Sequence, residues 1–345
     1  MLPIALLFAI HIAPPAESLP YKQPQLAAGD GLVAMTFGAG KAVYCAVSRD
    51  QGKTFAAPVK VAEGGHLALG RRRGPRIAIS RGTIVVSAIV GEKGGGRDGD
   101  LVAWRSADGG KTWAGPVTVN SVPGAAREGL HGMAAGDGRV MAAWLDLRKG
   151  GTRLAASVSR DGGATWSENR MAYESPDGNI CECCHPSVAM GRDGRVFLMW
   201  RNALAGARDM YLASSADGGA TFRVEKLGQG SWPLKACPMD GGGVVEEAGG
   251  KAVTAWRRDR SVFLSRPGRA EEELGLGKDP AIAASNGKTY VVWESPEGLK
   301  LRVSGEAENR LLAPHGAVFP SLVTAGGRVL AAWEDRGAIV VETLP

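Results

Sequence analysis

Three cysteines and a histidine lie within five consecutive positions of this 345-residue chain. Cys181, Cys183, Cys184 and His185 belong to the stretch "NICECCHPSV", in a sequence with only five cysteines in total. Thiol and imidazole groups spaced this closely can form disulfides or bind a soft metal ion. Cys45 instead lies in "KAVYCAVS", an alternating run in which a cysteine is typically a buried apolar residue.

Disulfide formation is the interpretation that we favour for this cluster. Cys237, in "KACPMD", brings the cysteines outside the Cys45 strand to four, an even set that two disulfides would use in an exported protein. Because adjacent cysteines seldom bridge each other, we expect Cys237 to pair with Cys183 or Cys184.

Metal binding is the alternative. In an extended segment, alternation places Cys181, Cys183 and His185 on one side. Neighbouring units could then add further sulfur and imidazole ligands, and such a set suits copper or zinc. The candidate ligands are Cys181, Cys183, Cys184, His185, Cys237 and His131.

A repeat organises the rest of the chain. Seven segments share a short apolar run, a turn and a second alternating run, and each continues into further alternating strands with no helical periodicity. Five of the segments end in tryptophan, at Trp144, Trp200, Trp256, Trp293 and Trp333. Repeated four-stranded units are typical of a β-propeller. We therefore predict an all-β propeller of four-stranded antiparallel blades, with seven blades favoured and six possible.

The last repeat offers only three strands before Pro345. We expect Leu19 to Gln23 to supply its fourth strand, since closure of the ring would hide sheet edges that otherwise invite aggregation.

The N-terminus predicts export. Leu2 to Ile12 is an apolar run too short to cross a bilayer, and small residues and prolines follow it up to Ser18. We expect residues 1–18 to be a signal peptide, although the usual positive start is missing, and residues 19–345 to form one propeller domain. The predicted location is secreted or periplasmic. A buried first strand is the alternative, and no later segment is long and apolar enough to span a membrane.

The charge pattern bears on the partner. The formal net charge is +6 and the pI is about 9.1, which suits an anionic ligand. The charges are scattered, and no basic stripe interleaved with aromatics indicates nucleic-acid binding.

A second motif occurs four times, as "SRDQGKTF", "SADGGKTW", "SRDGGATW" and "SADGGATF". Its aspartate can accept backbone N–H bonds, its glycine allows positive φ, and its aromatic residue can bury against the blade. One carboxylate per loop falls well short of a calcium site, so we predict turn stabilisation. The aspartates are Asp50, Asp108, Asp161 and Asp217.

These four copies resemble the Asp boxes of the sialidase and BNR-repeat superfamily of β-propellers. The resemblance covers nearly all of the chain after the predicted signal peptide. It implies the fold, but the superfamily includes glycosidases, lectin-like modules and scaffolds, so the reaction has to be argued from the site.

In a propeller, the turns that join strands one to two and three to four lie on one face, and the remaining connections lie on the other. That second face, the mouth face, is rich in arginines and carboxylates in this sequence. The "CECCH" run directly precedes an inner strand, so we expect His185 to face the channel entrance.

The resemblance to sialidases implies roles for four residues. Arg73 in "RRGPRIAI" is similar to the arginine of the family's RIP-type motif, and Asp98 follows in the position of its acid/base. Arg201 and Arg257, each directly after a blade tryptophan, are the candidates that would clamp a substrate carboxylate together with Arg73.

The sequence departs from the family at the nucleophile. Sialidases use a tyrosine late in the chain, whereas Tyr290 lies inside the alternating run "KTYVVW" and is expected to be buried. A carboxylate could substitute, with Glu294 or Glu334 activating water and Asp98 as the acid, which would give inversion.

Two function classes follow. The first is an exported glycoside hydrolase of the exo-alpha-sialidase type that acts on an acidic glycan, as a monomer, with no cofactor required. The second is a non-catalytic propeller that binds a glycan, a protein or a copper or zinc ion at its mouth.

Overall fold

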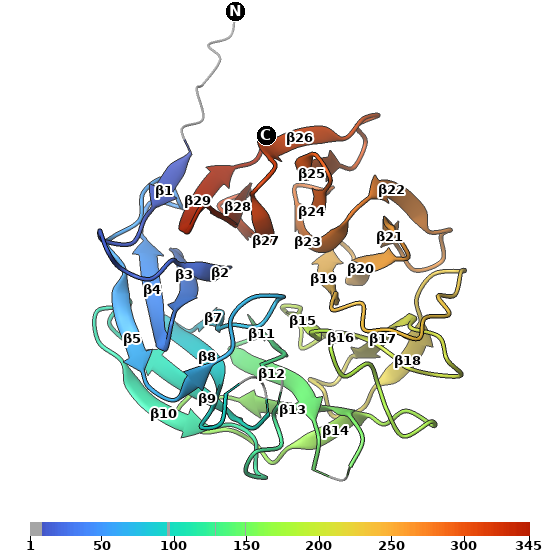
Figure 1. Ribbon diagram of the computed structural model, residues 1–345, viewed down its shortest axis with the longest axis horizontal. Coiled ribbons are helices and arrows are strands. Elements are labelled where there is room, and N and C mark those ends of the chain that lie inside the picture. Colours follow the sequence, from blue (N-terminus) through green and yellow to red (C-terminus); the bar gives the residue numbers. More distant parts are fainter. Residues whose placement is uncertain (1–8, 95–96, 128, 149) are drawn as a thin grey trace, which may run out of the picture.

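The computed structural model describes residues 9–94, 97–127, 129–148 and 150–345. Within these ranges the strands form seven antiparallel sheets, arranged as blades around a central axis (Figure 1). This confirms the prediction of an all-β propeller with seven blades. No helix occurs in the described ranges, and hence none that could cross a membrane.

Six blades each use consecutive strands, beginning at the axis and moving outward. Blade 1 contains β2 (Lys22–Gly29), β3 (Leu32–Ala39), β4 (Ala42–Ser48) and β5 (Val59–Glu63); blade 2 contains β6 (His66–Leu67), β7 (Arg76–Ser80), β8 (Thr83–Gly91), β9 (Asp100–Ser106) and β10 (Ala114–Thr118). Blade 3 contains β11 (His131–Gly136), β12 (Arg139–Asp146), β13 (Arg153–Ser159) and β14 (Arg170–Tyr173); blade 4 contains β15 (Ser187–Met190), β16 (Val196–Arg201), β17 (Met210–Ser215) and β18 (Arg223–Lys226). Blade 5 contains β19 (Gly242–Glu247), β20 (Lys251–Arg258), β21 (Ser261–Ser265) and β22 (Glu272–Leu276); blade 6 contains β23 (Lys278–Ser285), β24 (Lys288–Ser295), β25 (Gly298–Val303) and β26 (Arg310–Pro314).

Blade 7 joins the two ends of the described chain. It contains β27 (Val318–Ala325), β28 (Arg328–Asp335), β29 (Ala338–Thr343) and β1 (Ile10–Ile12). Strand β1 pairs antiparallel with β29, with Ile10 opposite Val341 and Ile12 opposite Ile339. The expectation that Leu19 to Gln23 supplies this strand is therefore wrong.

The reason for the difference is that Lys22 already begins the inner strand of blade 1. The closing strand lies inside the segment predicted to be a signal peptide, so this segment forms a first strand, as in the alternative, but Ile12 is the only buried residue of that strand. Cleavage of residues 1–18 stays a prediction.

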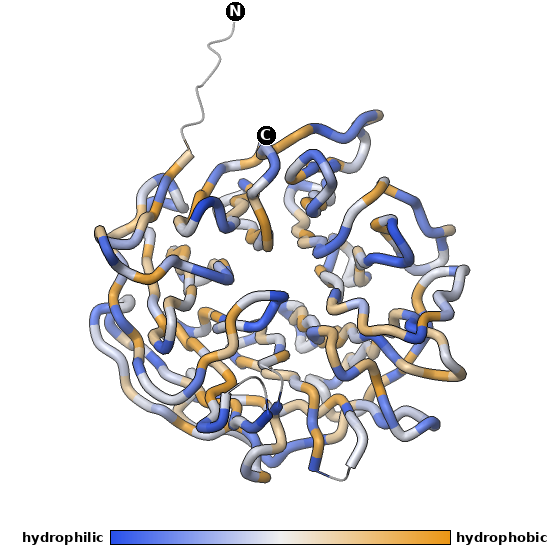
Figure 2. Tube along the Cα trace, viewed as in Figure 1, coloured by the Kyte–Doolittle hydropathy of each residue, from blue (hydrophilic) through white to orange (hydrophobic). Residues whose placement is uncertain are grey.

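The core lies between neighbouring blades. Figure 2 shows hydrophobic stretches along the strands and hydrophilic stretches in many of the connecting loops. Each repeated tryptophan packs against the preceding blade: Trp144 joins a cluster with Val85 of blade 2, and Trp200 joins one with Met141 of blade 3. Both indoles are fully buried. Replacing such a side chain by alanine costs about 3–5 kcal/mol, so the tryptophan repeat stabilises the ring.

The four Asp boxes form one recurring hydrogen-bonded turn. In the first, Asp50 Oδ1 accepts from the Ser48 hydroxyl at 2.7 Å and from the Thr54 amide at 2.9 Å, and Asp50 Oδ2 accepts from the Thr54 hydroxyl at 2.6 Å. These bonds, the Thr54 hydroxyl first, lower the pKa of Asp50 to about 2. Asp108, Asp161 and Asp217 make the same contacts. The predicted role in turn stabilisation is confirmed.

Candidate functional site

A cavity of about 200 Å³ lies in the central channel, where the inner strands begin on the mouth face. Its polar lining comprises Gln25, Arg72, Arg76, His185, Ser187 and Ser321, and its apolar lining includes Leu26, Met133, Val188, Val244, Ile282 and Leu322. Each blade's inner strand thus contributes between one and three residues, and the propeller geometry gathers them at the axis.

Arg72 is held by contacts that cross the channel from blade 2 to blades 6 and 7. Its Nε lies 3.2 Å from Asp279 Oδ1, its Nη1 donates to the Pro320 carbonyl at 2.7 Å, and its Nη2 donates to the Asp279 carbonyl. Arg72 and Asp279 are both buried, so this ion pair is shielded from solvent.

Arg76 is a second buried guanidinium beside the first. Its Nη1 donates to the carbonyls of Gly74 and Pro75, both at 3.1 Å, and its Nη2 donates to the Arg72 carbonyl. Within the described ranges no carboxylate lies within ion-pair distance of Arg76. Burial and the neighbouring Arg72 lower its pKa to about 9. Arg76 is therefore a buried cation without a protein counter-ion among those residues.

His185 completes the polar side of the cavity. It is buried, and its Nδ1 makes no hydrogen bond to the described residues. Burial, followed by the charges of Arg72 and Arg76, holds its pKa well below the usual range. The imidazole is therefore neutral at physiological pH and can donate or accept a hydrogen bond. The expectation that His185 faces the channel is confirmed.

Two buried carboxylates adjoin the cavity. The Asp279 amide donates to Asp240 Oδ2 at 3.0 Å, whereas Asp240 Oδ1 has no partner among the described residues. Burial, followed by the charge of Asp279, raises the pKa of Asp240 to about 7. Asp240 therefore titrates near neutral pH while Asp279 neutralises Arg72.

The predicted arginine clamp does not assemble around this cavity. Arg73 and Arg257 are not among its lining residues. Arg201 is fully buried and donates to three backbone carbonyls, those of Asp240 at 3.1 and 3.0 Å, Arg208 at 2.7 Å and Arg257 at 2.9 Å. Its hydrogen bonds therefore hold neighbouring connections together.

Arg201 and Arg257 nevertheless share one aromatic neighbour. The guanidinium carbons of Arg201 and Arg257 lie 5.1 and 5.4 Å from the centre of the Trp232 ring. Arg257 also lines a separate cavity of about 500 Å³, together with Lys278, Glu294 and His315. Arg257 thus borders an open space that is separate from the central cavity.

Asp98 lies apart from the central cavity. It lines a cleft of about 510 Å³ between blades 1 and 2, together with Glu63, Asp100 and Trp104. Its carboxylate accepts the Glu92 and Lys93 amides, both at 3.0 Å, and these bonds, Glu92 first, lower its pKa. The structure therefore does not bring Asp98 into one cavity with Glu294.

Glu294 and Glu334 occupy equivalent positions near the ends of β24 and β28. Glu294 Oε1 accepts the Phe319 amide at 2.7 Å, and Glu334 Oε1 accepts the Gln23 amide at 2.6 Å. Phe319 and Gln23 have φ of 55° and 59°, values that few side chains adopt. Each glutamate therefore fixes the left-handed residue at the second position of the next inner strand, β27 or β2. Burial raises the pKa of both carboxyls.

The cysteine cluster is compact and buried. The Cys181 sulfur lies 3.6 Å from that of Cys183 and 3.5 Å from that of Cys184, and all three lie within 4.8 Å of one another. Hydrogen bonds from Cys183 and Cys184 lower the pKa of Cys181 to about 3, while burial raises that of Cys184 to about 11. Met239 packs against the cluster.

The structure differs from both expectations for the other proposed members of this cluster. All five cysteines are free, so the predicted disulfides are not formed, and Cys237 is exposed. Among the described residues, the side chains close enough together to bind one metal ion are those of Cys181, Cys183 and Cys184. This group does not include His185, His131 or Cys237. His131 instead bonds to Ser87 at 2.9 Å through its Nε2. Cys45 is buried, as predicted.

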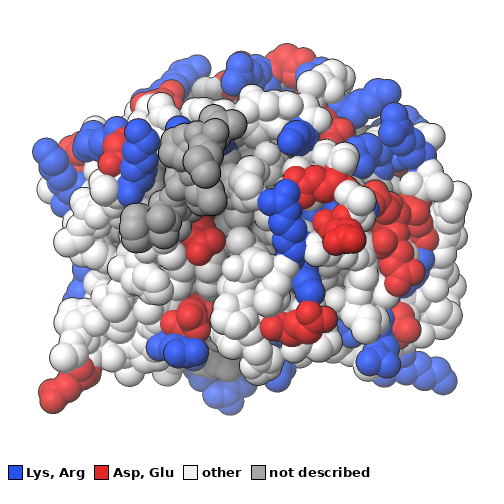
Figure 3. All heavy atoms as spheres, turned by 90° about the horizontal axis from the view of Figure 1, so that it is seen from above, with Lys and Arg blue, Asp and Glu red and all other residues white. Residues whose placement is uncertain are grey.

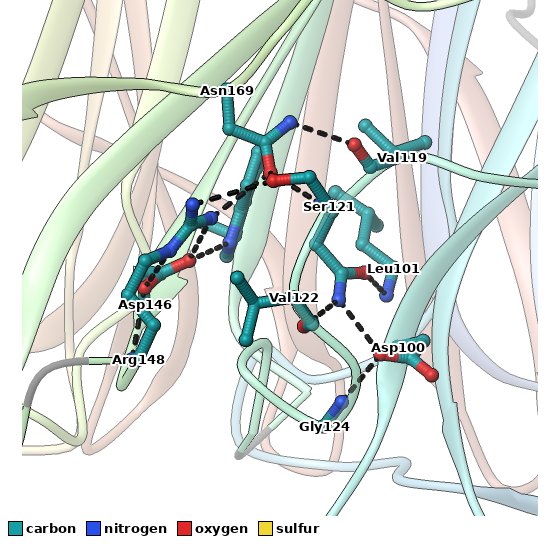
Figure 4. Close-up of polar contacts among 11 residues, drawn as sticks. Asp100, Leu101, Val119, Ser121, Val122, Gly124, Asp146, Arg148 and Asn169 are labelled. Carbon is teal, nitrogen blue, oxygen red and sulfur yellow. Dashed lines mark hydrogen bonds and ion pairs between the residues drawn. The ribbon is translucent and has the colours of Figure 1, made fainter.

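Other polar residues of the mouth face are used to join blades 2 and 3 (Figure 4). Arg148 forms an ion pair with buried Asp146 at 2.8 Å and donates to Asn169 Oδ1 at 2.9 Å. Asp100 accepts the Gly124 amide at 2.7 Å. Asn169 Nδ2 also donates to the Val119 carbonyl at 2.8 Å, which ties blade 3 to the connection that follows blade 2.

Figure 3 shows the distribution of charged side chains on one side of the molecule. On the side seen in Figure 3, Lys and Arg are interspersed with Asp and Glu, and no large patch has one sign. The scattered charge expected from the sequence is thus visible on that side.

Comparison with known families gives one match. The sequence profile of the BNR repeat-like domain family matches residues 41–236. No curated protein matches the sequence.

Solved structures resemble the fold along nearly its whole length. An alpha-L-arabinanase from Penicillium chrysogenum complexed with arabinobiose is 14% identical, with a TM-score of 0.58 and coverage of 99% of this chain and 98% of that one. A Hadza microbial sialidase is also 14% identical, with a TM-score of 0.59 and coverage of 99% and 70%. A virginiamycin B lyase from Staphylococcus aureus is 12% identical, with a TM-score of 0.57 and coverage of 98% and 100%. At such identities the likeness establishes the fold and leaves the reaction open.

Proposed function

This chain belongs to the BNR repeat-like domain family, and from that premise we propose that it acts on an acidic glycan whose anionic group enters the central cavity between Arg72 and Arg76. The fold is that of sialidase-like and arabinanase-like glycoside hydrolases and of lyases. The finer assignment, to an acidic sugar, depends on the chemistry of the cavity.

The observation that carries the proposal is the state of Arg76. A guanidinium removed from water is costly unless an anion compensates it. Arg72 already has Asp279, whereas Arg76 contacts carbonyls alone among the described residues. A carboxylate in the cavity would supply the missing charge, and a guanidinium can bind it through two parallel hydrogen bonds.

The remaining lining suits a sugar. His185 is neutral and buried, and its Nδ1 is available for a hydrogen bond to a hydroxyl group. The apolar side chains that line the cavity can pack against the non-polar face of a sugar ring. A cavity of about 200 Å³ accommodates one charged residue of a glycan, so we propose that the rest of the chain lies across the mouth face.

Glycoside hydrolysis is the reaction that we propose for the site. Asp98 is the candidate acid and Glu294 or Glu334 the candidate base, with Arg73, Arg201 and Arg257 as possible substrate-binding residues. Because Asp98 borders a different cleft from Glu294, a substrate would have to extend over several blades to meet both. We propose that the protein needs no cofactor for this activity and is exported as a monomer.

Binding is tested first. Titration calorimetry would compare a sialylated or uronic-acid oligosaccharide with its neutral counterpart, on the wild type, on Arg76→Met and on a control at an exposed arginine, Arg223→Met. We expect the acidic glycan alone to bind, with affinity at least ten-fold lower in Arg76→Met and unchanged in Arg223→Met. Equal binding of the two glycans, or an unaffected Arg76→Met, contradicts the proposal.

Catalysis is tested separately. Release of a fluorophore from a fluorogenic sialoside or uronide would be measured for the wild type and for Asp98→Asn. Hydrolysis by the wild type that is lost in Asp98→Asn supports the assigned acid. Tight binding without turnover in the wild type rejects hydrolysis and retains the acidic-glycan site.

A further inference from the structure

The cysteine cluster has a geometry that the glycan site does not explain. One sulfur, that of Cys181, is almost equally distant from two others, 3.6 Å from Cys183 and 3.5 Å from Cys184. A disulfide can join only two of the three. Since Cys237 is exposed and lies outside the group, a bridge within the cluster leaves one buried thiol unused.

The sulfur separations are close to those around one metal ion. With a metal–sulfur bond of about 2.3 Å, tetrahedral and trigonal arrangements give sulfur–sulfur separations of about 3.8 and 4.0 Å. The two shorter separations here lie slightly below these values, and the third is no more than 4.8 Å. The three sulfurs are therefore close enough together to surround one ion.

The backbone holds the cluster in place. The Ile180 amide donates to the Thr152 carbonyl of blade 3, and the Cys181 amide donates to the Arg201 carbonyl of blade 4, each at 2.9 Å. The segment is therefore anchored to two blades before any ligand binds. Fixed ligands lose little freedom on binding, which favours a specific site.

The donor set selects the ion. All three atoms are thiol sulfurs, and the neighbour packed against them is the thioether side chain of Met239. Within the described ranges, no imidazole or carboxylate group joins the close set. Thiolate and thioether ligands favour monovalent copper, whereas structural zinc requires four ligands, commonly with histidine or a fourth cysteine.

We propose that Cys181, Cys183 and Cys184 form a three-coordinate site for a monovalent copper ion, covered by Met239. The site is separate from the central cavity and does not depend on the proposed glycan activity. When the ion binds, each thiol that still carries a proton releases it, and the resulting thiolate sulfur coordinates the ion. No electron is transferred, because the copper is supplied in its reduced state.

The proposed copper site lies next to residues of the mouth face. Cys184 precedes His185, which lines the central cavity, and Arg71 donates to the Met239 sulfur at 2.9 Å. An ion held by the cluster would therefore fix the connection that carries His185.

The test uses reduced, full-length protein under anaerobic conditions. Copper(I) would be titrated against the chromogenic chelator bathocuproine disulfonate, with zinc(II) in a parallel titration. We expect one equivalent of copper(I) per chain, bound more tightly than zinc(II), with absorption at the thiolate-to-copper charge-transfer wavelengths. The variant Cys183→Ser should bind copper(I) at least 100-fold more weakly than the wild type, whereas the matched control Cys237→Ser should bind it equally well.

A measurement on the wild type does not depend on how the variants fold. Alkylation followed by mass spectrometry should show Cys181, Cys183 and Cys184 protected by copper(I), while Cys237 reacts at its usual rate. X-ray absorption should show sulfur ligands alone. Less than one-fifth of an equivalent bound, protection of Cys237 instead, a nitrogen ligand, or tighter binding of zinc(II) overturns the proposal. So does a disulfide within the cluster that persists when both reductant and copper(I) are present.

Discussion

Arg76 donates a hydrogen bond to the carbonyl oxygen of Arg72, so two buried guanidinium groups lie along one side of the central cavity. Asp279 compensates the charge of Arg72, and the Arg76 guanidinium remains without a carboxylate among the described residues. Elsewhere on the mouth face, Arg148 is paired with Asp146, whereas buried Arg201 donates to backbone carbonyls and, unlike Arg76, does not line the central cavity.

Stability should depend on the ionisation of Asp240. Its folded pKa, about 7, exceeds the usual value of an aspartate, so the native state binds the proton more tightly than the unfolded chain does. We therefore expect the free energy of unfolding to fall as pH rises from about 4 to 7, by roughly 1 to 4 kcal/mol, and to level off above that. Urea denaturation across this range measures the slope.

The control for Asp240 is Asp240→Asn, which keeps an oxygen to accept the Asp279 amide but cannot ionise. This variant should lose most of the slope and be more stable than the wild type at pH 8. An identical slope in the two proteins would assign it to other groups.

Replacing the aspartate of an Asp-box turn should destabilise the protein, although this side chain lies near the surface. Asp161→Ala removes the acceptor of the Ser159 hydroxyl and of the Thr165 amide and hydroxyl, and we expect a loss of about 1–2 kcal/mol in the free energy of unfolding. Chemical denaturation of Asp161→Ala beside Asp193→Ala measures it. Asp193 lies in an exposed ion pair, so its change should stay within about 0.5 kcal/mol.

Acid should abolish the same contribution. The folded pKa of Asp161, about 2, lies below the unfolded value, so its stabilising effect is present above about pH 4 and is lost as pH falls towards 2. The difference between wild type and Asp161→Ala should shrink over that interval. A difference that stayed constant down to pH 2 would show that the carboxylate charge is not its source.

Glu334 should act mainly on the backbone of blade 1. Glu334→Ala leaves the Gln23 amide without its acceptor and should cost about 1–3 kcal/mol, while Glu334→Gln retains an acceptor oxygen and should cost less than half as much. Denaturation measures both variants, and fluorogenic hydrolysis measures their activity. If Glu334→Gln is stable yet inactive, the glutamate has the catalytic role suggested by the sequence.

Deletion of β1 should expose a sheet edge. A chain lacking residues 1–13 loses the strand that covers β29, and we expect lower stability together with concentration-dependent self-association. Analytical ultracentrifugation and urea denaturation measure the two effects, with deletion of residues 1–8 as the control. A truncated chain that stayed monomeric and equally stable would indicate that the mature protein does not need this strand.

The fold could be predicted because its signals are local and repeated. Trp144 and Trp200 recur at the same point of their blades, and the Asp50 box shows its turn within eight residues. Strand β1 could not be predicted with the same certainty, because three residues pair with a partner more than 300 positions away. Its pattern alone does not distinguish it from an export signal.

The site was harder to predict for a geometric reason. The resemblance to the RIP-type motif favoured Arg73, but Arg71 and Arg72 have φ of 51° and 63°, and a motif match does not reveal that two consecutive residues adopt this left-handed backbone conformation. Arg72 therefore lines the cavity in place of Arg73. Arg76 was missed because "RIAI" looks like an ordinary inner strand, and Asp240 because "CPMDG" reads as the start of one of the seven repeats.

The pairing of β1 with β29 over three residues is where the two ends of the described chain meet and close the ring. In the described chain, each of the other six blades is built from consecutive strands. Blade 7 alone combines strands from both ends, so β1 can detach from β29 while the strands of the other blades stay paired. Thermal fraying should therefore begin by peeling of the N-terminal segment from blade 7, and the backbone amides of β29 should exchange with deuterium before those of the inner strands.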